Sequence, residues 1–519
     1  MGQRLLVIGL DSADAALIEQ WMAEGRLPVL AQLAGAGIWG RLRTTAEVMH
    51  VSAWPSLYTG CHPGRHGLYH AFQVRAGSRG IHRADPRWRA VEPFWVTLDR
   101  AGRRVIVADA FMDAPVADFR GIQIVDYGTW TWFWRPESRP AGILREIRRR
   151  FGRYPAPEHS DQVTIPEQIR FRDTLVRAAT VKGEMLAWLL TSHPWETAFV
   201  MFAEPHGGGH YLWHGEDPDY PLRPRERLPA GFRPLADVYA AVDRAIGRIL
   251  EAVGEVDLMV VSGDGMGPNH SASHLMPELL HRLGLSAATS RGEHREEPPP
   301  PGLAARLRRL LPLSVRQSLS RCLPRETRRR LAMKWMNSGI DWSRTRMFCI
   351  PNSNEGYFRL NLAGREPEGR VAVEEAPALL SELAQELDRL VNPENARRIA
   401  HAVHAIDRLF PGSERPHLPD LVVSFDFDAR TTTRIRGPRS GEIAGPAPWE
   451  VPAHYTGNHR PNAFLLAAGP HLRRVPLPAD AHILDIAPTI LAYAGVPSPL
   501  PLDGRPLPIV AGVPAATGG

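Results

Sequence analysis

Histidine and aspartate side chains recur along the chain beside segments that have the composition of a buried strand. Six of them have this placement: Asp11, His50, His206, His210, Asp264 and His459. In open α/β sheets the ends of the strands meet at one edge, where ligands bind. Imidazole and carboxylate groups are ligands of divalent and transition metals. We therefore expect the six side chains to converge on one metal site, whose chemistry would be hydrolysis or transfer at an ester.

The spacing of His206 and His210 is informative in itself. The two residues follow the strand-like segment 197–202 and lie four positions apart. A helical turn there would place both side chains on one face, where they can bind one ion. The three glycines between them weaken a helix and let the backbone approach a ligand closely. A pair of structural histidines is the competing interpretation.

Asp11, Asp264 and His459 each stand in a turn or loop next to an apolar run, in the stretches VIGLDS, SGDGMG and TGNHRP. Asp11 suits a cation ligand, a helix cap or a ribose contact. The ribose role fails because no G-x-G-x-x-G follows the strand. The glycines around Asp264 permit a tight turn with an exposed side chain, and His459 adds a third imidazole.

Short apolar runs alternate with helical patterns over most of the chain. Strands are predicted at residues 4–10, 103–108, 122–125, 197–202, 257–261, 347–350, 357–360, 421–425 and 463–468. Helices are predicted at residues 13–24, 53–59, 173–190, 235–253, 376–390 and 486–494. This alternation predicts an α/β fold with a mostly parallel central sheet and helices on both faces.

The regular pattern breaks between residues 286 and 340, which contain EEPPPP and Arg-rich helical turns. A segment of this length between core elements predicts an inserted helical cap over the site. The core then consists of residues 1–285 and 341–510, followed by a loose tail at 511–519. Residues 426–455 are rich in Arg, Thr, Gly and Pro, and we expect a long loop there that leads back to His459.

The composition suits a folded domain and excludes some partners. The chain has 519 residues, 44% of them hydrophobic, and 62 Lys+Arg face 56 Asp+Glu, which gives a net charge of +6. This balance is too mild to indicate nucleic-acid binding. Arg-rich patches at 145–153 and 306–330 suit anionic substrates or lipid surfaces, but solvated helix faces are the favoured explanation. The second patch has few aromatic residues, which argues against base stacking.

The cysteines and the apolar runs bear on location. Cys61, Cys322 and Cys349 are too few and too widely spaced for a disulfide framework or a zinc knuckle. No apolar run approaches 18 residues, and no leader pattern precedes the first strand, so we expect no transmembrane segment and a cytoplasmic protein. The sequence does not indicate an oligomeric state.

Seven stretches occur in a recognisable order along the chain: VIGLDS, PVLAQLAGAGIWGRLRTT, SAWPSLYTGCHPGRHGLY, VVSGDGMGP, NSNEGYFRLNLAGREPEG, TGNHRP and ILDIAPTILAYAGVPSPLPLDGRPL. Together they resemble the alkaline phosphatase superfamily, in its branch of type I phosphodiesterases and nucleotide pyrophosphatases. The resemblance runs from about residue 4 to residue 508. It implies an alkaline phosphatase-like fold, a phosphorylated small-molecule or lipid-like substrate, and two divalent ions, usually zinc, about 4 Å apart around a Thr or Ser nucleophile.

Three positions match the family's site and three depart from it. Asp11 matches the N-terminal metal ligand, and His210 and His459 match two histidines of one metal site. The family's D-x-x-x-H begins here with a histidine, His206. The nucleophile position holds His50.

The third departure is in the family's Ser-Asp-His-Gly, which appears here as Ser262-Gly263-Asp264-Gly265. One ligand is lost to Gly263, and Asp264 takes the place of the histidine. The polar replacements can still bind metal, but the site has fewer negative ligands. Affinity for two zinc ions should therefore fall, and one ion, or a different metal, becomes an alternative.

Three mechanisms fit these residues. His50 could be the nucleophile and form a phosphohistidine. It could instead be a ligand or general base while water attacks. Ser52 could be the nucleophile in a shifted register.

Neighbouring polar residues have simpler structural interpretations. Ser56 and Thr59 are expected to stabilise the local helix and its turn. His62 and His66 fall in the turn that follows, and His66, which matches a His-Gly of the family, is expected to be structural. His270 and His274 in PNHSASH could line the rim of the site.

The sequence leaves three functions open. The first is a metal-dependent hydrolase of phosphate esters, a phosphodiesterase or phosphomonoesterase. The second is a catalytically inactive family member that acts as a binding or regulatory protein. The third is phosphoryl or sulfuryl transfer. Sulfatases need a Cys or Ser converted to formylglycine, and Cys61 in C-H-P-G-R matches their motif only in part.

Overall fold

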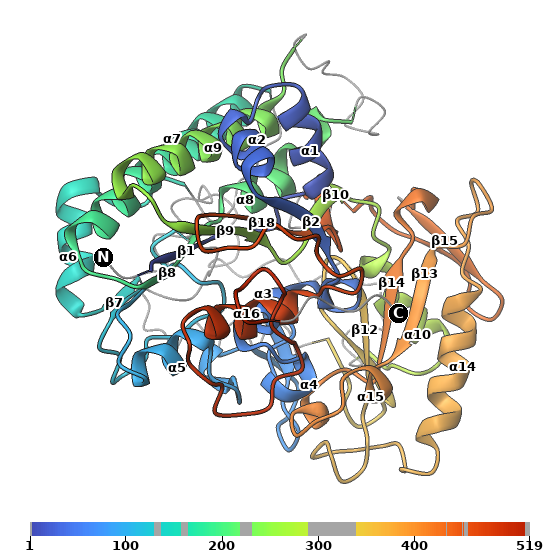
Figure 1. Cartoon of the computed structure of the whole chain (residues 1–519). Coiled ribbons are helices and arrows are strands. Elements are labelled where there is room, and N and C mark those ends of the chain that lie inside the picture. The colour runs from blue at the N-terminus through green and yellow to red at the C-terminus, as the bar shows by residue number, and fades with distance from the viewer. Residues whose placement is uncertain are drawn as a thin grey trace, which may run out of the picture. The chain divides into compact units, whose positions relative to one another are not determined.

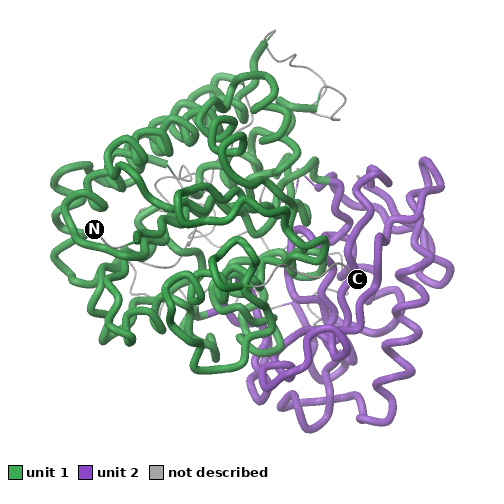
Figure 2. The backbone as a smooth tube through the Cα atoms, in the orientation of Figure 1, with its two compact units in different colours: residues 1–70, 85–269, 452–519 green, residues 71–84, 270–451 purple. Residues whose placement is uncertain are grey.

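The computed structural model describes residues 3–128, 136–156, 165–217, 231–288, 339–431, 433–448, 450 and 455–513. The chain divides into two compact units, shown in Figure 2. The first consists of Met1–His70, Asp85–Asn269 and Pro452–Gly519, and the second of Ala71–Ala84 and His270–Val451. The predicted core, residues 1–285 and 341–510, runs through both units. The predicted cap falls mostly on residues 289–338, outside the described residues, so this division of the chain stays a prediction.

A twisted sheet forms the centre of the first unit. Its strand order, within the described residues, is β2-β18-β9-β1-β8-β5-β6-β7. The strands are β1 (Leu5–Leu10), β2 (Ile38–Leu42), β5 (Val105–Ala108), β6 (Ile122–Val125), β7 (Glu137–Arg139), β8 (Thr197–Phe202), β9 (Asp257–Ser262) and β18 (Ala463–Ala468). The inner strands from β9 to β6 are parallel, whereas β18, β2 and β7 pair antiparallel. The prediction of a mostly parallel central sheet is therefore confirmed.

Helices cover both faces of this sheet (Figure 1). The helices of this unit are α1 (Ala15–Ala23), α2 (Pro28–Ala36), α3 (Ala53–Thr59), α4 (Pro63–His66), α5 (Phe94–Arg100), α6 (Ala141–Phe151), α7 (Ile165–Ser192), α8 (Glu204–Leu212), α9 (Pro234–Val253) and α16 (Ile486–Tyr493). Alternate residues of β1 enter two separate cores because successive side chains of a strand point to opposite faces. Leu6, Ile8 and Leu10 pack with α7 and α9, and Leu5 and Val7 pack with α3, α5 and α16.

A short strand pair lies at the carboxyl end of the sheet. Strands β10 (Gly265–Pro268) and β17 (Gly457–Arg460) are antiparallel, with Met266 opposite His459. Because β10 follows β9 after a two-residue turn, this pairing brings His459 beside that turn.

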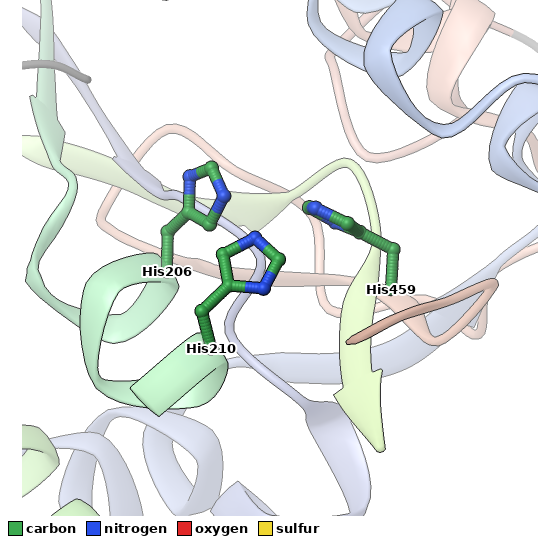
Figure 3. A group of neighbouring side chains, drawn as sticks. All are labelled: His206, His210 and His459. Carbon is green, nitrogen blue, oxygen red and sulfur yellow. The ribbon is translucent and has the colours of Figure 1, made fainter. Parts of the chain in front are cut away.

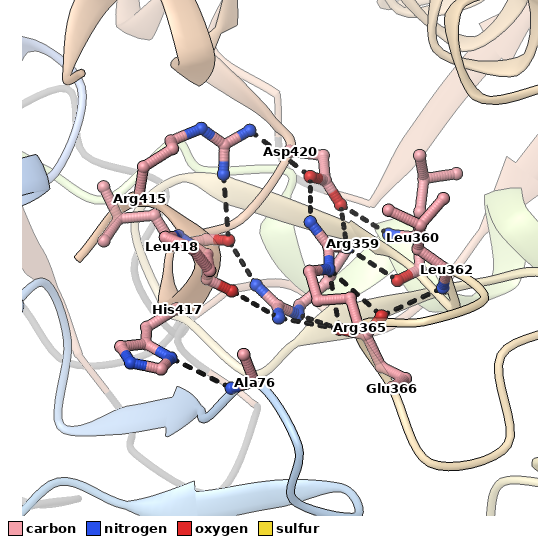
Figure 4. A network of polar contacts seen from close by, with 11 residues as sticks. Ala76, Arg359, Leu360, Leu362, Arg365, Glu366, Arg415, His417, Leu418 and Asp420 are labelled. Carbon is pink, nitrogen blue, oxygen red and sulfur yellow. Dashed lines mark hydrogen bonds and ion pairs between the residues drawn. The ribbon is translucent and has the colours of Figure 1, made fainter. Parts of the chain in front are cut away.

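The second unit is built on an antiparallel sheet in the order β11-β12-β14-β13. Its elements are β3 (Phe72–Val74), β4 (Ile81–Arg83), α10 (Met276–Arg282), β11 (Met347–Ile350), β12 (Gly356–Leu360), α14 (Ala376–Asp388), β13 (Ala400–Ala405), α15 (Ile406–Leu409), β14 (Leu421–Phe425), β15 (Arg434–Gly437) and β16 (Gly441–Ala444). A buried ionic network supports the sheet (Figure 4): Arg359 pairs with Glu366 at 2.7 Å, and Arg365 with Asp420 at 2.6 Å. Each buried charge thus has an opposite partner, which such burial requires.

The loop predicted at residues 426–455 is wrong in part, because β15 and β16 form a hairpin inside it. Ile435 and Ile443 are fully buried in the core of the second unit. The carboxylate of Glu386 accepts from the backbone of Arg439 and Ser440 and fixes the hairpin turn. Two isolated isoleucines among charged residues gave too weak an alternation to predict these strands.

The Arg-rich patch at 145–153 falls largely on α6, where its arginines are exposed. The second patch, 306–330, lies outside the described residues. No helix in the described part of the chain combines the length and the apolarity that a membrane span needs.

Candidate active site

The segment that carries His206 and His210 is helical, as the four-residue spacing required. Helix α8 begins directly after β8, and the two imidazole rings lie on one face with their centroids 4.7 Å apart. The glycines of this helix permit close packing, because a Cβ on Gly209 would lie 2.6 Å from Cγ of Met266 in β10. Tertiary packing thus stabilises a helix whose glycines disfavour it.

His459 reaches the same place from β17. Strand β17 packs directly against α8, and a Cβ on Gly457 would lie 2.1 Å from the carbonyl oxygen of Gly209. His206, His210 and His459 each place one ring nitrogen within 4.8 Å of the other two (Figure 3). Side chains about 250 positions apart therefore form the three-imidazole group that the sequence predicted.

Each of the three imidazoles is held by a hydrogen bond at Nδ1. His206 Nδ1 lies 2.7 Å from Oδ2 of Asp11, and His459 Nδ1 lies 2.7 Å from Oδ2 of Asp264. His210 Nδ1 donates to the carbonyl oxygen of Gly457 at 3.0 Å. Carboxylate and carbonyl oxygens accept, so a neutral ring carries its proton on Nδ1 and its lone pair on Nε2. Such partners orient the histidines of metal sites.

Both oxygens of the Asp11 carboxylate have partners in the site. The indole Nε1 of Trp54 donates to Oδ1 at 2.6 Å, and His206 approaches Oδ2. The cap of α1 comes from Asp14 instead, whose Oδ1 accepts from the backbone of Ala16 and Leu17. Of the roles that the sequence left open for Asp11, the structure therefore excludes the helix cap.

His50 lies against this group, on a 3₁₀ turn at His50–Ser52 that leads into α3. Its ring stacks on that of His459, with centroids 4.1 Å apart and an interplanar angle of 27°. The ring of His70 follows at 5.9 Å from His50. The sequence analysis missed His70, which stands in the HGLYH stretch after the helix and could have been flagged as one more buried histidine there.

The imidazole of His459 is neutral near pH 7. Burial lowers its pKa well below the ordinary value, and His50, His210, His206 and His70 lower it further. Its contact with Asp264 is therefore a hydrogen bond from a neutral ring to a carboxylate. A neutral imidazole is the form that binds metal.

A family model provides the decisive comparison. The model for type I phosphodiesterase / nucleotide pyrophosphatase matches residues 5–450. The chain belongs to this family. It is accordingly a phosphoric ester hydrolase by family, and the family is generally dependent on divalent metals. Among curated proteins, none matches the chain.

The chain is also similar to solved structures of low sequence identity. One is a phosphonoacetate hydrolase from Sinorhizobium meliloti 1021 in complex with phosphonoformate, with 11% identity, a TM-score of 0.48 and coverage of 93% of this chain and 94% of that chain. Another is human ectonucleotide pyrophosphatase/phosphodiesterase 5, with 13% identity, a TM-score of 0.47 and 97% coverage of both chains. The murine protein of that name, in an inactive form with AMP, has 14% identity, a TM-score of 0.46 and coverage of 97% and 98%.

The positions where this phosphodiesterase family member departs from the resemblance lie together. His206 is one of the three imidazoles of the group, Asp264 contacts His459, and Gly263 lies directly before Asp264 with little space for a side chain. A Cβ there would lie 3.0 Å from the Cβ of Ala53, a separation that real structures rarely show. The three substitutions thus concern one centre.

Ser52 is engaged in local structure. Its hydroxyl is fully buried, donates to the carbonyl oxygen of Met49 at 2.6 Å and contacts Thr45 Oγ1 at 2.8 Å. This geometry disfavours Ser52 as a nucleophile in a shifted register.

The residues expected to be structural have structural contacts. His66 Nε2 lies 3.0 Å from the hydroxyl of Ser56, and Thr59 donates to the carbonyl oxygen of Pro55 at 2.6 Å. Cys61 is buried, and this burial raises the pKa of its thiol, as for an inert cysteine. His270 and His274 belong to the second unit.

A buried charged cluster that the sequence analysis missed lies at the carboxyl ends of β5 and β8. The Lys182 ammonium is 2.9 Å from Oδ2 of Asp109, and Tyr154 donates to Glu204 at 2.8 Å. Burial alone would lower the pKa of Lys182, but Asp109 and Glu204 raise it above its ordinary value, and Asp11 adds to this. The ammonium therefore stays charged beneath the site. Lys182 shares the buried face of α7 with apolar residues, but a lysine in such a helix is usually solvated, so the sequence alone did not indicate its burial.

Proposed function

We propose that this phosphoric ester hydrolase uses a divalent cation, zinc, held by His206, His210 and His459, and that His50 replaces the family's Thr or Ser nucleophile. One observation carries the proposal. Each of the three imidazoles is anchored through Nδ1 to a fixed acceptor, which directs Nε2 for metal binding. Isolated structural histidines have no need of such a shared arrangement.

The donor set fits the proposed ion. Imidazole nitrogens are ligands that zinc favours, and a three-histidine set leaves a coordination position open, as catalytic zinc sites do. Two of the three histidines have a carboxylate partner, which is a common feature of metal-binding histidines. When bound, the cation would act as a Lewis acid that polarises a phosphoryl oxygen.

His50 is the side chain proposed to act on the phosphorus. As a nucleophile, its ring nitrogen forms a bond to phosphorus while the P–O ester bond breaks, and the alcohol leaves with the electron pair and takes up a proton. Water then cleaves the P–N bond and regenerates the imidazole. As a general base, His50 would instead take a proton from attacking water, and no P–N bond would form.

The proposed substrate is a phosphomonoester or phosphodiester of a small molecule or a lipid-like alcohol. AMP and phosphonates, which are bound in the similar structures, are suitable probe classes. The cytoplasmic location stays a prediction, which fractionation of the cells that make the protein would test.

The experiment combines metal analysis with an activity assay. Purified protein would be analysed for transition metals and assayed on aryl phosphomonoesters and phosphodiesters, before and after chelation and zinc addition. We expect His210→Ala and His459→Ala to lose both metal and more than about 100-fold in activity, beyond the loss that a missing supporting partner causes.

His471→Ala is the matched control. His471 Nδ1 also contacts a carboxylate, Asp257 at 2.8 Å, but outside the histidine group. This variant should keep metal content and activity. A protein that takes up no metal and stays inert with every ester would refute the proposal and favour the inactive binding protein.

The role of His50 needs a separate measurement. An alkaline quench preserves a phosphohistidine, so a phosphorylated peptide that contains His50 would identify it as the nucleophile. Activity abolished by His50→Ala without such a peptide would identify a base. Full activity of His50→Ala would exclude both roles.

A further inference from the structure

We infer that this centre takes one divalent ion, and that Asp11 and Asp264 support its histidines instead of binding a second ion. The inference rests on the proposed function, since it needs the histidine group to bind metal. It departs from the family resemblance, which implies two ions. A second ion would need ligands from positions 11, 50, 263 and 264, and each of these can be examined in turn.

Position 11 has its oxygens committed. Oδ1 of Asp11 accepts from Trp54 Nε1 at 2.6 Å, and Oδ2 contacts His206 Nδ1 at 2.7 Å. Asp11 is also almost completely buried, with 2% of its surface exposed. To bind an ion directly, this carboxylate would have to give up a charge-assisted hydrogen bond in a buried place. The donor of that bond would then be left buried without its acceptor, which costs further free energy.

Position 264 supports the opposite side of the group. Oδ2 of Asp264 contacts His459 Nδ1 at 2.7 Å, and the hydroxyl of Ser12 lies 3.3 Å from the same nitrogen. Each of the two carboxylates therefore holds one imidazole, Asp11 that of His206 and Asp264 that of His459. This is the carboxylate–histidine arrangement that orients a ligand and raises its basicity.

Position 263 offers no side chain and little space for one. The hypothetical Cβ of Gly263 lies 3.0 Å from the Cβ of Ala53, and the carbonyl oxygen of Gly263 accepts from Thr44 Oγ1 at 2.6 Å. The backbone is thus fixed against the start of α3. A ligand carboxylate could enter here only if Ala53, at the start of α3, gave way by a few tenths of an ångström.

The His50 imidazole is poorly oriented to bind the same ion as the His459 imidazole. The two rings are nearly parallel, at 27°, with centroids 4.1 Å apart. The lone pair of an imidazole lies in the plane of its ring, so stacked rings direct their lone pairs along separate planes. The group of ligand atoms that lie within 4.8 Å of one another, in the part of the chain that the structure describes, contains His206, His210 and His459 but not His50.

Charge gives an independent reason for a single ion. Two carboxylates, those of Asp11 and Asp264, contact the histidine group, and one divalent cation balances them. A second divalent cation would leave the buried centre with excess positive charge, which is costly to desolvate.

The test counts zinc ions without using activity. Chelator-stripped protein would be equilibrated with zinc, and the bound metal measured by elemental analysis, with affinity from competition by a chromophoric chelator. We expect one zinc per chain. Asp11→Asn and Asp264→Asn should still bind one zinc, with affinity about 10–100-fold weaker. In Asp11→Asn a single amide oxygen would serve the two donors, Trp54 and His206.

Asp14→Asn is the matched control for the loss of a nearby carboxylate. Asp14 caps α1 and bonds to Asn462 at 2.8 Å, without contact to an imidazole of the group. Its zinc affinity should equal that of the wild type. Thermal unfolding would verify that each variant is folded. If only one of Asp11→Asn and Asp264→Asn folds, that variant is enough for the test.

The outcomes separate the two proposals. Two zinc ions in the wild type, with a fall to one in Asp11→Asn or Asp264→Asn, would overturn the one-ion inference and leave the proposed function intact. One zinc with wild-type affinity in both site variants would overturn the supporting role. No zinc in the wild type would overturn the proposed function itself.

Discussion

Removal of the buried ammonium of Lys182 should destabilise the first unit strongly. Lys182 is fully buried, pairs with Asp109 at 2.9 Å and donates to the carbonyl oxygens of Gly128 at 3.2 Å and Met201 at 3.1 Å. Lys182→Met keeps most of the side-chain volume but removes the cation. Asp109 would remain buried without its counter-charge, which costs about 3–5 kcal/mol in comparable ion pairs.

Thermal unfolding measures this effect. For a unit as long as the first one, the unfolding entropy implies that each kcal/mol of lost stability lowers the unfolding midpoint by about 1.5 °C. We therefore expect the midpoint temperature of Lys182→Met to fall by about 5–8 °C. Asp109→Asn alone should also destabilise the protein, because the ammonium then lacks its partner. The double variant should be less destabilised than the sum of the two, by about 1 kcal/mol or more.

If Lys182→Met melts within about 1 °C of the wild type, where the estimate is several degrees, the ammonium is not a buried partner of Asp109. Strict additivity in the double variant would likewise show that the two charges do not interact. Tyr154→Phe removes the neighbouring hydrogen bond to Glu204, at 2.8 Å, but leaves Lys182 and Asp109 in place, so it serves as a control for general disturbance of the cluster.

Two further predictions concern space and pH. Gly263→Asp should destabilise the protein by about 1–3 kcal/mol, because its Cβ meets that of Ala53 at 3.0 Å. Added Ala53→Gly should restore part of the loss, and a single variant as stable as the wild type would contradict this. Burial, together with Arg43, lowers the pKa of His482 to about 4. The stability that neutral His482 provides is therefore present above its unfolded pKa of about 6.5 and is lost as the pH falls toward 4, by up to about 3 kcal/mol. In His482→Asn the unfolding temperature should depend less on pH between about 6.5 and 4. An unchanged pH dependence would show that His482 does not cause this loss of stability.

The helices and strands predicted best from the sequence are those whose bounds are set by the residues within and directly beside them. Residues 197–202 form β8 and residues 53–59 form α3 with the predicted bounds. In the first, a threonine precedes five consecutive apolar residues. The second ends at Gly60, whose φ of 66° is the left-handed conformation that stops a helix. The convergence of His206, His210 and His459 was predictable as well, because strand ends meet at one edge of such a sheet.

The sequence could not predict which side chains within the site contact one another. Asp11 and Asp14 both stand in the turn after β1, and either type of position suits a cap. Only the folded structure shows that Asp14 caps α1 and that Asp11 contacts the imidazole of His206. Lys182 was missed for a similar reason, since a lysine in an amphipathic helix is usually solvated. Its burial follows from Asp109, which comes from a different part of the chain.

The replacements at this centre compensate one another physically. A histidine at 206 in place of the family's aspartate needs an acceptor for its Nδ1–H, and Asp11 supplies it at 2.7 Å. An aspartate at 264 in place of the family's histidine removes one imidazole but anchors His459 at the same distance. Gly263 lies close against Ala53, and each of the two carboxylates holds one imidazole of the group. Independent decay of an unused site would have no reason to produce such matched hydrogen bonds, because an unpaired buried histidine or aspartate costs stability. The pairing of each new side chain with an old one is therefore an argument that the centre still binds an ion.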